Sequence, residues 1–271
     1  MSKITSLKAR EILNSRGNPT VEVELVLGDV VAVASVPSGI SKGKNEALEL
    51  VDKDSSHYEG LGVLSAVNNI NSEISKEVLG KDFNQEKLDK FLITLDGTLN
   101  KGRLGANAIL AVSLAFARAS AKEKNVELYE YIGGLANNKD FKLPQPMLNI
   151  INGGKHSDSG LDIQEFMLAP VGFENFHKKI EVAEGVIAHL RTLLQNAGFS
   201  VSVGDEGGFA PKLNSNTDAF VFILKAITLA GYSTDKVKIG IDVASSTFYK
   251  NGAYELGSAN QNKVLNSIEM I

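Results

Sequence analysis

The chain has 271 residues, of which 22% are charged and 43% hydrophobic, and its formal net charge is −4. This composition is typical of globular proteins, and the length is sufficient for two domains. The negative charge argues against nucleic acid or an anionic membrane as the main partner, because both require clustered positive charge. The chain contains no cysteine, so disulfides and thiol chemistry are excluded, which fits a reducing compartment. No apolar run has the pattern of a signal peptide or reaches the ~18 residues of a membrane span, so we expect a cytoplasmic protein.

The first part of the chain predicts an antiparallel β-meander. Apolar and charged residues alternate between 21 and 27, Gly28 and Asp29 supply a two-residue turn, and an apolar run continues to residue 36. Pro37 ends this strand and opens a polar loop, after which the acidic residues from Asn45 predict a helix. Two glycine-rich stretches, 39–44 and 60–62, lack the spacing of phosphate-binding loops.

Helical periodicity follows from 62 to 134. Apolar residues recur every three or four positions, and the segment 105–124 is alanine-rich enough to be a buried helix that covers the meander. Asn107, near the start of that segment, is interpreted as a helix cap. A sharp change in composition marks a linker, so we predict domains at 1–135 and 147–271 joined by 136–146.

The stretch 148–170 predicts two buried strands. Its apolar runs, 148–151 and 163–169, are each bounded by Gly, Asn, Ser or Pro. Asn152, Gly153, Gly154 and His156 follow the first run, and we expect the two glycines to let the backbone approach a ligand.

The adjacent polar pair Gln164 and Glu165 interrupts the second run. A carboxylate in an apolar strand requires a partner, because an unpaired buried charge is costly. From this stretch alone, Glu165 is either a group of a functional site or part of a structural ion network.

The second half contains two long helical segments, 174–196 and 215–230. Asp205 and Glu206 lie between an apolar alternation and two glycines, which predicts either carboxylates held on a functional bend or a solvated acidic turn. A strand at 237–243 carries Asp242 toward its carboxyl end. In α/β barrels this position holds catalytic and metal-binding groups, although Asp242 could equally cap a following helix.

Eight separated blocks give the chain a resemblance to the enolase family along its whole length. They are AREILNSRGNPTVEVE, VPSGISKG, LDGTLNK, LGANAILAVSLA, LNIINGGKH, QEFMLAP, VGDEGGFAP and IGIDVASS. The resemblance implies an α+β N-terminal domain, an antiparallel meander plus helices, followed by a β/α barrel of the TIM type. The barrel would begin strand, strand, helix, helix, and we expect it to be incomplete in this chain.

This resemblance also implies an activity. Enolases are lyases of glycolysis that catalyse the Mg²⁺-dependent, reversible dehydration of 2-phosphoglycerate to phosphoenolpyruvate. The partner would therefore be a small-molecule substrate, with a homo-oligomer expected at full length. Some enolases are also reported at the cell surface, so the resemblance leaves room for a cell-surface or secreted fraction.

Site residues follow from the same resemblance. Glu206 would be the general acid at the departing hydroxyl and Glu165 its partner, while His156 and Gln164 would contact substrate. Asp242 would be a ligand of the tighter magnesium ion, and Ser41 would lie on the loop that brings a second magnesium ion with substrate. In a regular strand Gln164 and Glu165 point to opposite faces, so both reach substrate only at a strand end or bend.

Several positions depart from the family pattern. Ile40 stands where Ala is usual and Lys42 where Thr is usual, and Asn14 and Ala111 replace a usual Asp and Gly. The chain stops at Ile271, whereas the resemblance implies a continuation with a lysine base, two further carboxylate ligands and a phosphate-binding block. We therefore expect the 271-residue chain to be inactive alone.

Two other functions are alternatives to this one. The first is a non-catalytic enolase fragment that acts as a binding or interaction protein. The second is an acid-sugar dehydratase of the wider superfamily, which the enolase-type blocks GDEGG and SGIS disfavour.

Overall fold

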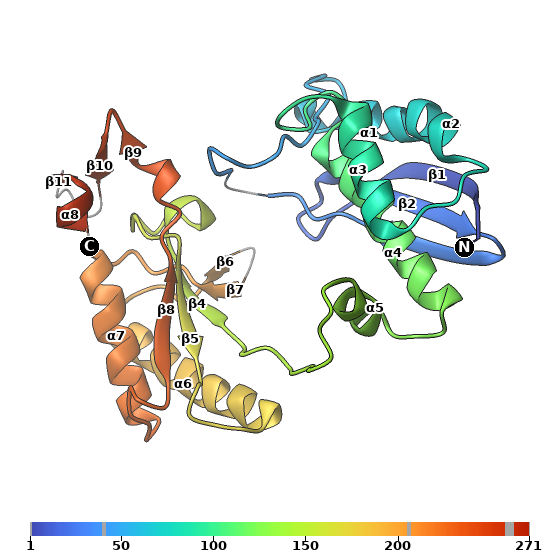
Figure 1. Cartoon of the computed structure of the whole chain (residues 1–271). Helices are drawn as coiled ribbons and strands as arrows, with labels where there is room; N and C mark the ends of the chain where they lie inside the picture. The colour runs from blue at the N-terminus through green and yellow to red at the C-terminus, as the bar shows by residue number, and fades with distance from the viewer. Residues whose placement is uncertain (1, 40–41, 205–206, 258–262, 271) are drawn as a thin grey trace. The chain divides into compact units, whose positions relative to one another are not determined.

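The structure is a computed structural model that describes residues 2–39, 42–204, 207–257 and 263–270. Apart from the short loop 40–44, the chain divides into two compact units between Phe141 and Lys142 (Figure 1). Within the described ranges, no helix combines the length and the apolar character needed to cross a membrane.

The first unit is built on a three-stranded antiparallel sheet. Its strands are β1 (Ile4–Leu13), β2 (Pro19–Leu27) and β3 (Val30–Ser35), in the order β1-β2-β3. Alternate residues of β2 are buried, as the period of two predicts, and Gly28 adopts φ 59° in the tight turn before β3. The predicted meander is confirmed.

Helices pack against this sheet as the periodicity predicted. They are α1 (Leu64–Asn69), which continues through a π-helical turn (Ile70–Ile74) into α2 (Ser75–Val78), then α3 (Gln85–Asp96), α4 (Ala106–Glu123) and α5 (Leu128–Leu135). Helix α4 contacts both β2 and β3, and its small residues Ala108, Ala111 and Ala115 are fully buried there. Alanine lets the helix approach the strands closely, which closes one apolar core.

Two local predictions in this unit are wrong. The segment 45–57 contains no helix, because its polar side chains bind backbone elsewhere: the Asp52 carboxylate accepts from the N–H groups of Leu64 and Ser65. Asn107 is not a cap either. Its amide exchanges two hydrogen bonds with the backbone of Leu50, at 3.1 and 3.0 Å, and so joins α4 to an extended segment.

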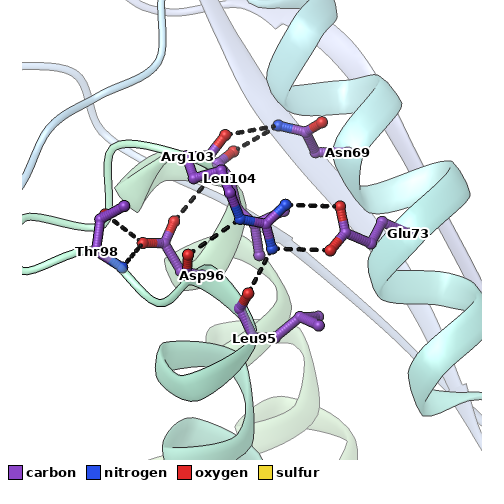
Figure 2. Close-up of polar contacts among 7 residues, drawn as sticks. All are labelled: Asn69, Glu73, Leu95, Asp96, Thr98, Arg103 and Leu104. Carbon is purple, nitrogen blue, oxygen red and sulfur yellow. Dashed lines mark hydrogen bonds and ion pairs between the residues drawn. The ribbon is translucent and has the colours of Figure 1, made fainter.

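A polar network fixes the loop between α3 and α4 (Figure 2). Arg103 binds both carboxylate oxygens of Glu73, at 2.9 and 2.8 Å, and these bonds hold the pKa of Glu73 below its usual range. Burial opposes ionisation of Asp96, but bonds from Thr98 and from the Leu104 N–H outweigh it and hold the pKa of Asp96 below its usual range. The loop therefore depends on two ionised carboxylates.

The second unit contains a five-stranded mixed sheet. In chain order its strands are β4 (Leu148–Asn152), β5 (Glu165–Ala169), β6 (Val203–Gly204), β7 (Gly207–Phe209) and β8 (Lys238–Asp242). The spatial order is β6-β7-β4-β5-β8, with β4 parallel to β7 and the other pairs antiparallel. The strands of the described ranges form an open sheet and no closed barrel, in keeping with the expected incomplete barrel.

Two long helices supply the apolar core of this sheet. Helix α6 (Phe176–Asn196) buries Val182, Val186 and Leu190, and α7 (Asn216–Leu229) buries further residues at helical spacing. Asn175 caps α6, and Ser215 caps α7 by accepting a bond from the Asp218 N–H. The short strands β6 and β7 come between these helices in the sequence. The predicted order strand, strand, helix, helix did not include them.

A small antiparallel sheet follows β8. It consists of β9 (Tyr249–Lys250), β10 (Ala253–Leu256) and β11 (Lys263–Leu265), and the short helix α8 (Ser267–Met270) comes next. Asp162 accepts a hydrogen bond from the Gly257 N–H at 2.8 Å, so this segment is joined to the loop before β5.

Candidate active site

Three polar residues line up at one end of the five-stranded sheet. Asn152 is the last residue of β4, Glu165 the first of β5 and Asp242 the last of β8. Because β5 runs antiparallel to both neighbours, Glu165 is the register partner of Asn152 on one side and of Asp242 on the other. Strand order therefore gathers side chains that lie up to 90 residues apart in the sequence.

His156 joins Glu165 at this end. It is the last residue of a 3₁₀ turn (Gly154–His156) directly after β4, and its Nδ1 lies 3.3 Å from Glu165 Oε1. Only 7% of the His156 side chain and 18% of the Glu165 side chain are exposed. At this distance the imidazole and the carboxylate attract one another as an ion pair when His156 is protonated.

Gln164 occupies the position before the first residue of β5. Its N–H donates to the Asp242 carbonyl at 3.1 Å, and its own carbonyl accepts from the Gly153 N–H at 2.9 Å. The side chain is 4% exposed, and among the described residues its Oε1 has no hydrogen-bond partner. Gln164 thus lies at a strand end. Adjacent side chains of a regular strand point to opposite faces, so Gln164 and Glu165 can reach one site only from such a position.

The paired glycines after β4 have a different role from the predicted one. A Cβ on Gly153 would overlap the carbonyl oxygen of Ile163, and one on Gly154, at φ 51°, would lie 3.2 Å from the Gln164 Cα. The group that approaches these glycines is the chain's own segment 161–164. Their smallness therefore positions Gln164 and Glu165.

Asp242 presents its carboxylate at the open end of β8. Its Oδ1 accepts a hydrogen bond from the Ala244 N–H at 3.0 Å, and Ala244 adopts the left-handed φ of 46°. Carboxylate oxygens are the ligands that Mg²⁺ prefers, so the donor type fits this ion. Among the described residues no group of three or more His, Cys, Asp or Glu side chains is arranged to hold a metal.

Two of the predicted site residues, Ser41 and Glu206, lie outside the described residues. The structure does describe the start of the loop that precedes Ser41: the carboxylate of Glu49 accepts from the Ser38 hydroxyl at 3.0 Å and from the Gly39 N–H at 3.1 Å. It also describes the residues on either side of positions 205 and 206, since β6 ends at Gly204 and β7 begins at Gly207.

Asn152 had no predicted role, although the structure places its amide against the backbone of Gly207 and Gly208. The side chain is fully buried and donates to the carbonyls of Gly207 and Gly208. Its signal in the sequence was a polar residue closing an apolar strand. The partners could not be read from the sequence, since they lie more than 50 positions further along the chain.

Comparison with known families accounts for both units. A family model for the enolase N-terminal domain matches residues 4–132, and one for the enolase C-terminal TIM barrel domain matches residues 140–270. The two matches follow one another in the family's order and together span nearly all of the chain. With its meander-and-helix first unit and its barrel-type strands in the second, this chain belongs to the enolase family.

Proposed function

We propose that this chain carries those residues of an enolase active site that assist the loss of the substrate hydroxyl. The reaction is the Mg²⁺-dependent, reversible dehydration of 2-phospho-D-glycerate to phosphoenolpyruvate. The observation that carries the proposal is the position of Glu165 between His156 and Asp242 at one end of the sheet. Membership of a lyase-type, small-molecule-binding family supports it.

The reaction explains why these residue types are needed. A proton next to a carboxylate is weakly acidic, and hydroxide is a poor leaving group, so the reaction needs both charge stabilisation and a proton donor. When bound, magnesium would stabilise the negative charge that develops on the substrate carboxylate. Asp242 would hold that ion, and Ser41 would serve a second one.

We assign the proton donor to Glu206 and its support to Glu165 and His156. As the C3–O bond breaks, the electron pair left at carbon 2 forms the new double bond, and the hydroxyl takes a proton from Glu206 to leave as water. Glu165 would bind the departing hydroxyl. His156, whose Nδ1 lies 3.3 Å from Glu165 Oε1, would hold the Glu165 carboxylate in position. Gln164, buried beside Glu165, would contact substrate.

These six residues do not make a complete catalytic set. Mg²⁺ prefers near-octahedral coordination by oxygen, of which Asp242 would supply one ligand, and none of the six is assigned as the base at carbon 2. We therefore propose that turnover needs further groups. Turnover should be absent when the 271-residue chain is assayed alone and should appear when the chain is extended by the C-terminal half of an enolase.

The test of the assignment uses Glu206→Gln in this extended chain. The substitution keeps shape and hydrogen bonding but removes the transferable proton, so dehydration should fall by roughly 10²–10⁴-fold. Exchange of the carbon-2 proton with solvent should largely survive, because it needs the base and not the acid. If exchange and dehydration are abolished together while substrate still binds, Glu206 belongs to proton abstraction and the assignment is wrong.

A further inference from the structure

The side chain of Asn152 binds the backbone of the glycine-rich segment around β6 and β7. We call the described glycines of this segment, Gly204, Gly207 and Gly208, the bend. The Nδ2 of Asn152 donates to the carbonyl oxygens of Gly207 and Gly208, the second at 3.0 Å, and its Oδ1 accepts from Asn149 Nδ2 at 2.5 Å. Asn152 is 0% exposed, so both hydrogens of its amide are committed to the two carbonyls of the bend.

The glycines of the bend fit around this amide. A Cβ on Gly204 would lie 2.7 Å from Asn152 Nδ2, and one on Gly208 would lie 3.1 Å from it. Gly207 and Gly208 also adopt left-handed φ angles of 80° and 71°, which favour glycine. Gly204, Gly207 and Gly208 therefore all lie close to the Asn152 amide.

Asn152 also connects this bend to the other residues of the site. It is the register partner of Glu165 in the ladder between β4 and β5. Its carbonyl accepts from the Ser157 hydroxyl at 2.9 Å, directly after the turn that carries His156. Asn152 thus contacts the bend through its side chain and the strand end at which His156 and Glu165 meet through its backbone.

We propose that Asn152 is a positioning residue for the dehydration step, because its amide fixes the backbone at Gly207 and Gly208, which directly follow the proposed acid Glu206 in the sequence. This inference rests on the proposed function. An aspartate or an apolar side chain cannot take over this role, because neither has the two N–H donors that the carbonyls of Gly207 and Gly208 accept.

The first test compares Asn152→Ala and Asn152→Asp in the extended chain with the control Asn175→Asp. The control makes the same chemical change at the cap of α6, where an aspartate oxygen also accepts the bond from the Lys178 N–H. A misplacement of about 1 Å costs roughly 10²-fold in rate, so kcat for dehydration should fall by about that factor in both Asn152 variants. KM and carbon-2 proton exchange should change little, and Asn175→Asp should match the parent.

The split between the two rates separates positioning from general loss of structure. A variant that is simply less well folded loses exchange, dehydration and binding in proportion to its active fraction. Equal losses of exchange and dehydration, or no loss of dehydration in a folded Asn152 variant, would therefore overturn the proposal.

A second test needs no turnover and uses the 271-residue chain. Gly204→Ala should clash with the Asn152 amide and raise the solvent exchange of the Gly208 and Phe209 amides. In an Asn152→Ala background the same change should raise it less, because the space is vacated. Additive effects would show that Asn152 does not hold the bend. If instead the effects are coupled but the parent extended chain does not dehydrate 2-phosphoglycerate, the proposed function fails while the contact stands.

Discussion

Glu165, the first residue of β5, is the register partner of Asp242, the last residue of β8, so two carboxylates stand side by side on neighbouring strands. Like charges directly opposite one another in a sheet are destabilising. His156 lies next to Glu165, and Asp242 is exposed at the strand end, which limits the repulsion without removing it. Repulsion between the two carboxylates would oppose the stability of this unit, and the proposed cation would relieve it.

We expect Asp242→Asn to stabilise the metal-free 271-residue chain. The change removes the like-charge pair yet keeps an oxygen that can accept the Ala244 N–H, so the gain should be about 0.2–1 kcal/mol. In the chain extended by the C-terminal half of an enolase, Mg²⁺ should raise the unfolding temperature of the parent but not of Asp242→Asn, because the proposed ligand is lost. Thermal unfolding with and without Mg²⁺ measures both effects.

The control for this prediction is Asp235→Asn. Asp235 lies in the same unit, has a side chain that is 93% exposed, and pairs with Lys238 at 3.7 Å. Its replacement should leave both the stability and the response to Mg²⁺ nearly unchanged. A parent-like response to Mg²⁺ in Asp242→Asn would remove Asp242 from the metal site.

The network around Arg103 should make the first unit sensitive to acid. The pKa of Asp96 is lowered in the folded state, so its contribution is present above the unfolded pKa of about 3.8 and is lost as the pH falls through the folded value. Asp96→Asn leaves one acceptor for the Thr98 and Leu104 N–H groups and should cost about 1–3 kcal/mol at neutral pH. The difference between parent and variant should shrink below about pH 4.

Amide exchange of β2 peptides as a function of urea and pH measures the stability of this unit separately from the other. Glu86→Gln is the matched control, because the bond from Lys90 also lowers the pKa of Glu86, but both side chains of that pair are more than 70% exposed. This control should behave like the parent at every pH. A constant difference between parent and Asp96→Asn down to acid pH would contradict the assigned role of ionised Asp96.

Local periodicity predicted the hairpin of β2 and β3 and the helices α4, α6 and α7, but not the short strands β6, β7 and β9–β11. The alternation in β2 and the alanine-rich face of α4 identify each element from its own residues, since burial repeats every two or every three to four positions. Asn107 was misread because its partner, Leu50, is 57 residues away. A side chain that can cap a helix locally can equally bind a distant backbone, and only the fold decides between them.

The site was predicted as a set of residue types, but its arrangement was not. Strand order, which no local pattern specifies, places Asp242 beside Glu165. The glycines at 153 and 154 were correctly seen as permitting a close approach, but the approaching group proved to be the segment 161–164. Asn152 was missed for the same reason, because its partners Gly207 and Gly208 come after α6 in the sequence.

We expect the first unit to resist proteolysis longer than the second. Its sheet and helices close one continuous core, whereas residues of the second unit's described edge strands remain exposed, including Val203 at 63% and Ile241 at 43%. Limited proteolysis of the 271-residue chain should therefore accumulate a product ending near the linker 136–146. Cleavage within the first unit, with residues 146–271 surviving as a soluble monomer, would reverse the predicted order.

The last prediction concerns the pair His156 and Glu165 as a unit. In the extended chain, His156→Ala and Glu165→Gln should each lower kcat/KM for dehydration by roughly 10²–10⁴-fold, the usual range for groups that handle a proton. If the two act through the 3.3 Å contact, the double variant should lose little more than the more severe single variant, because the second change removes an interaction already lost.

The first unit supplies the control, since His57 Nε2 lies 2.7 Å from Glu11 Oε1 in a second His–Glu pair. His57→Ala and Glu11→Gln should alter the stability of that unit, where Glu11 also accepts from the Val63 N–H, and leave kcat near the parent value. Independent, multiplicative losses for His156→Ala and Glu165→Gln would mean that the two side chains act on separate steps. Glu165 would then serve the departing hydroxyl without His156.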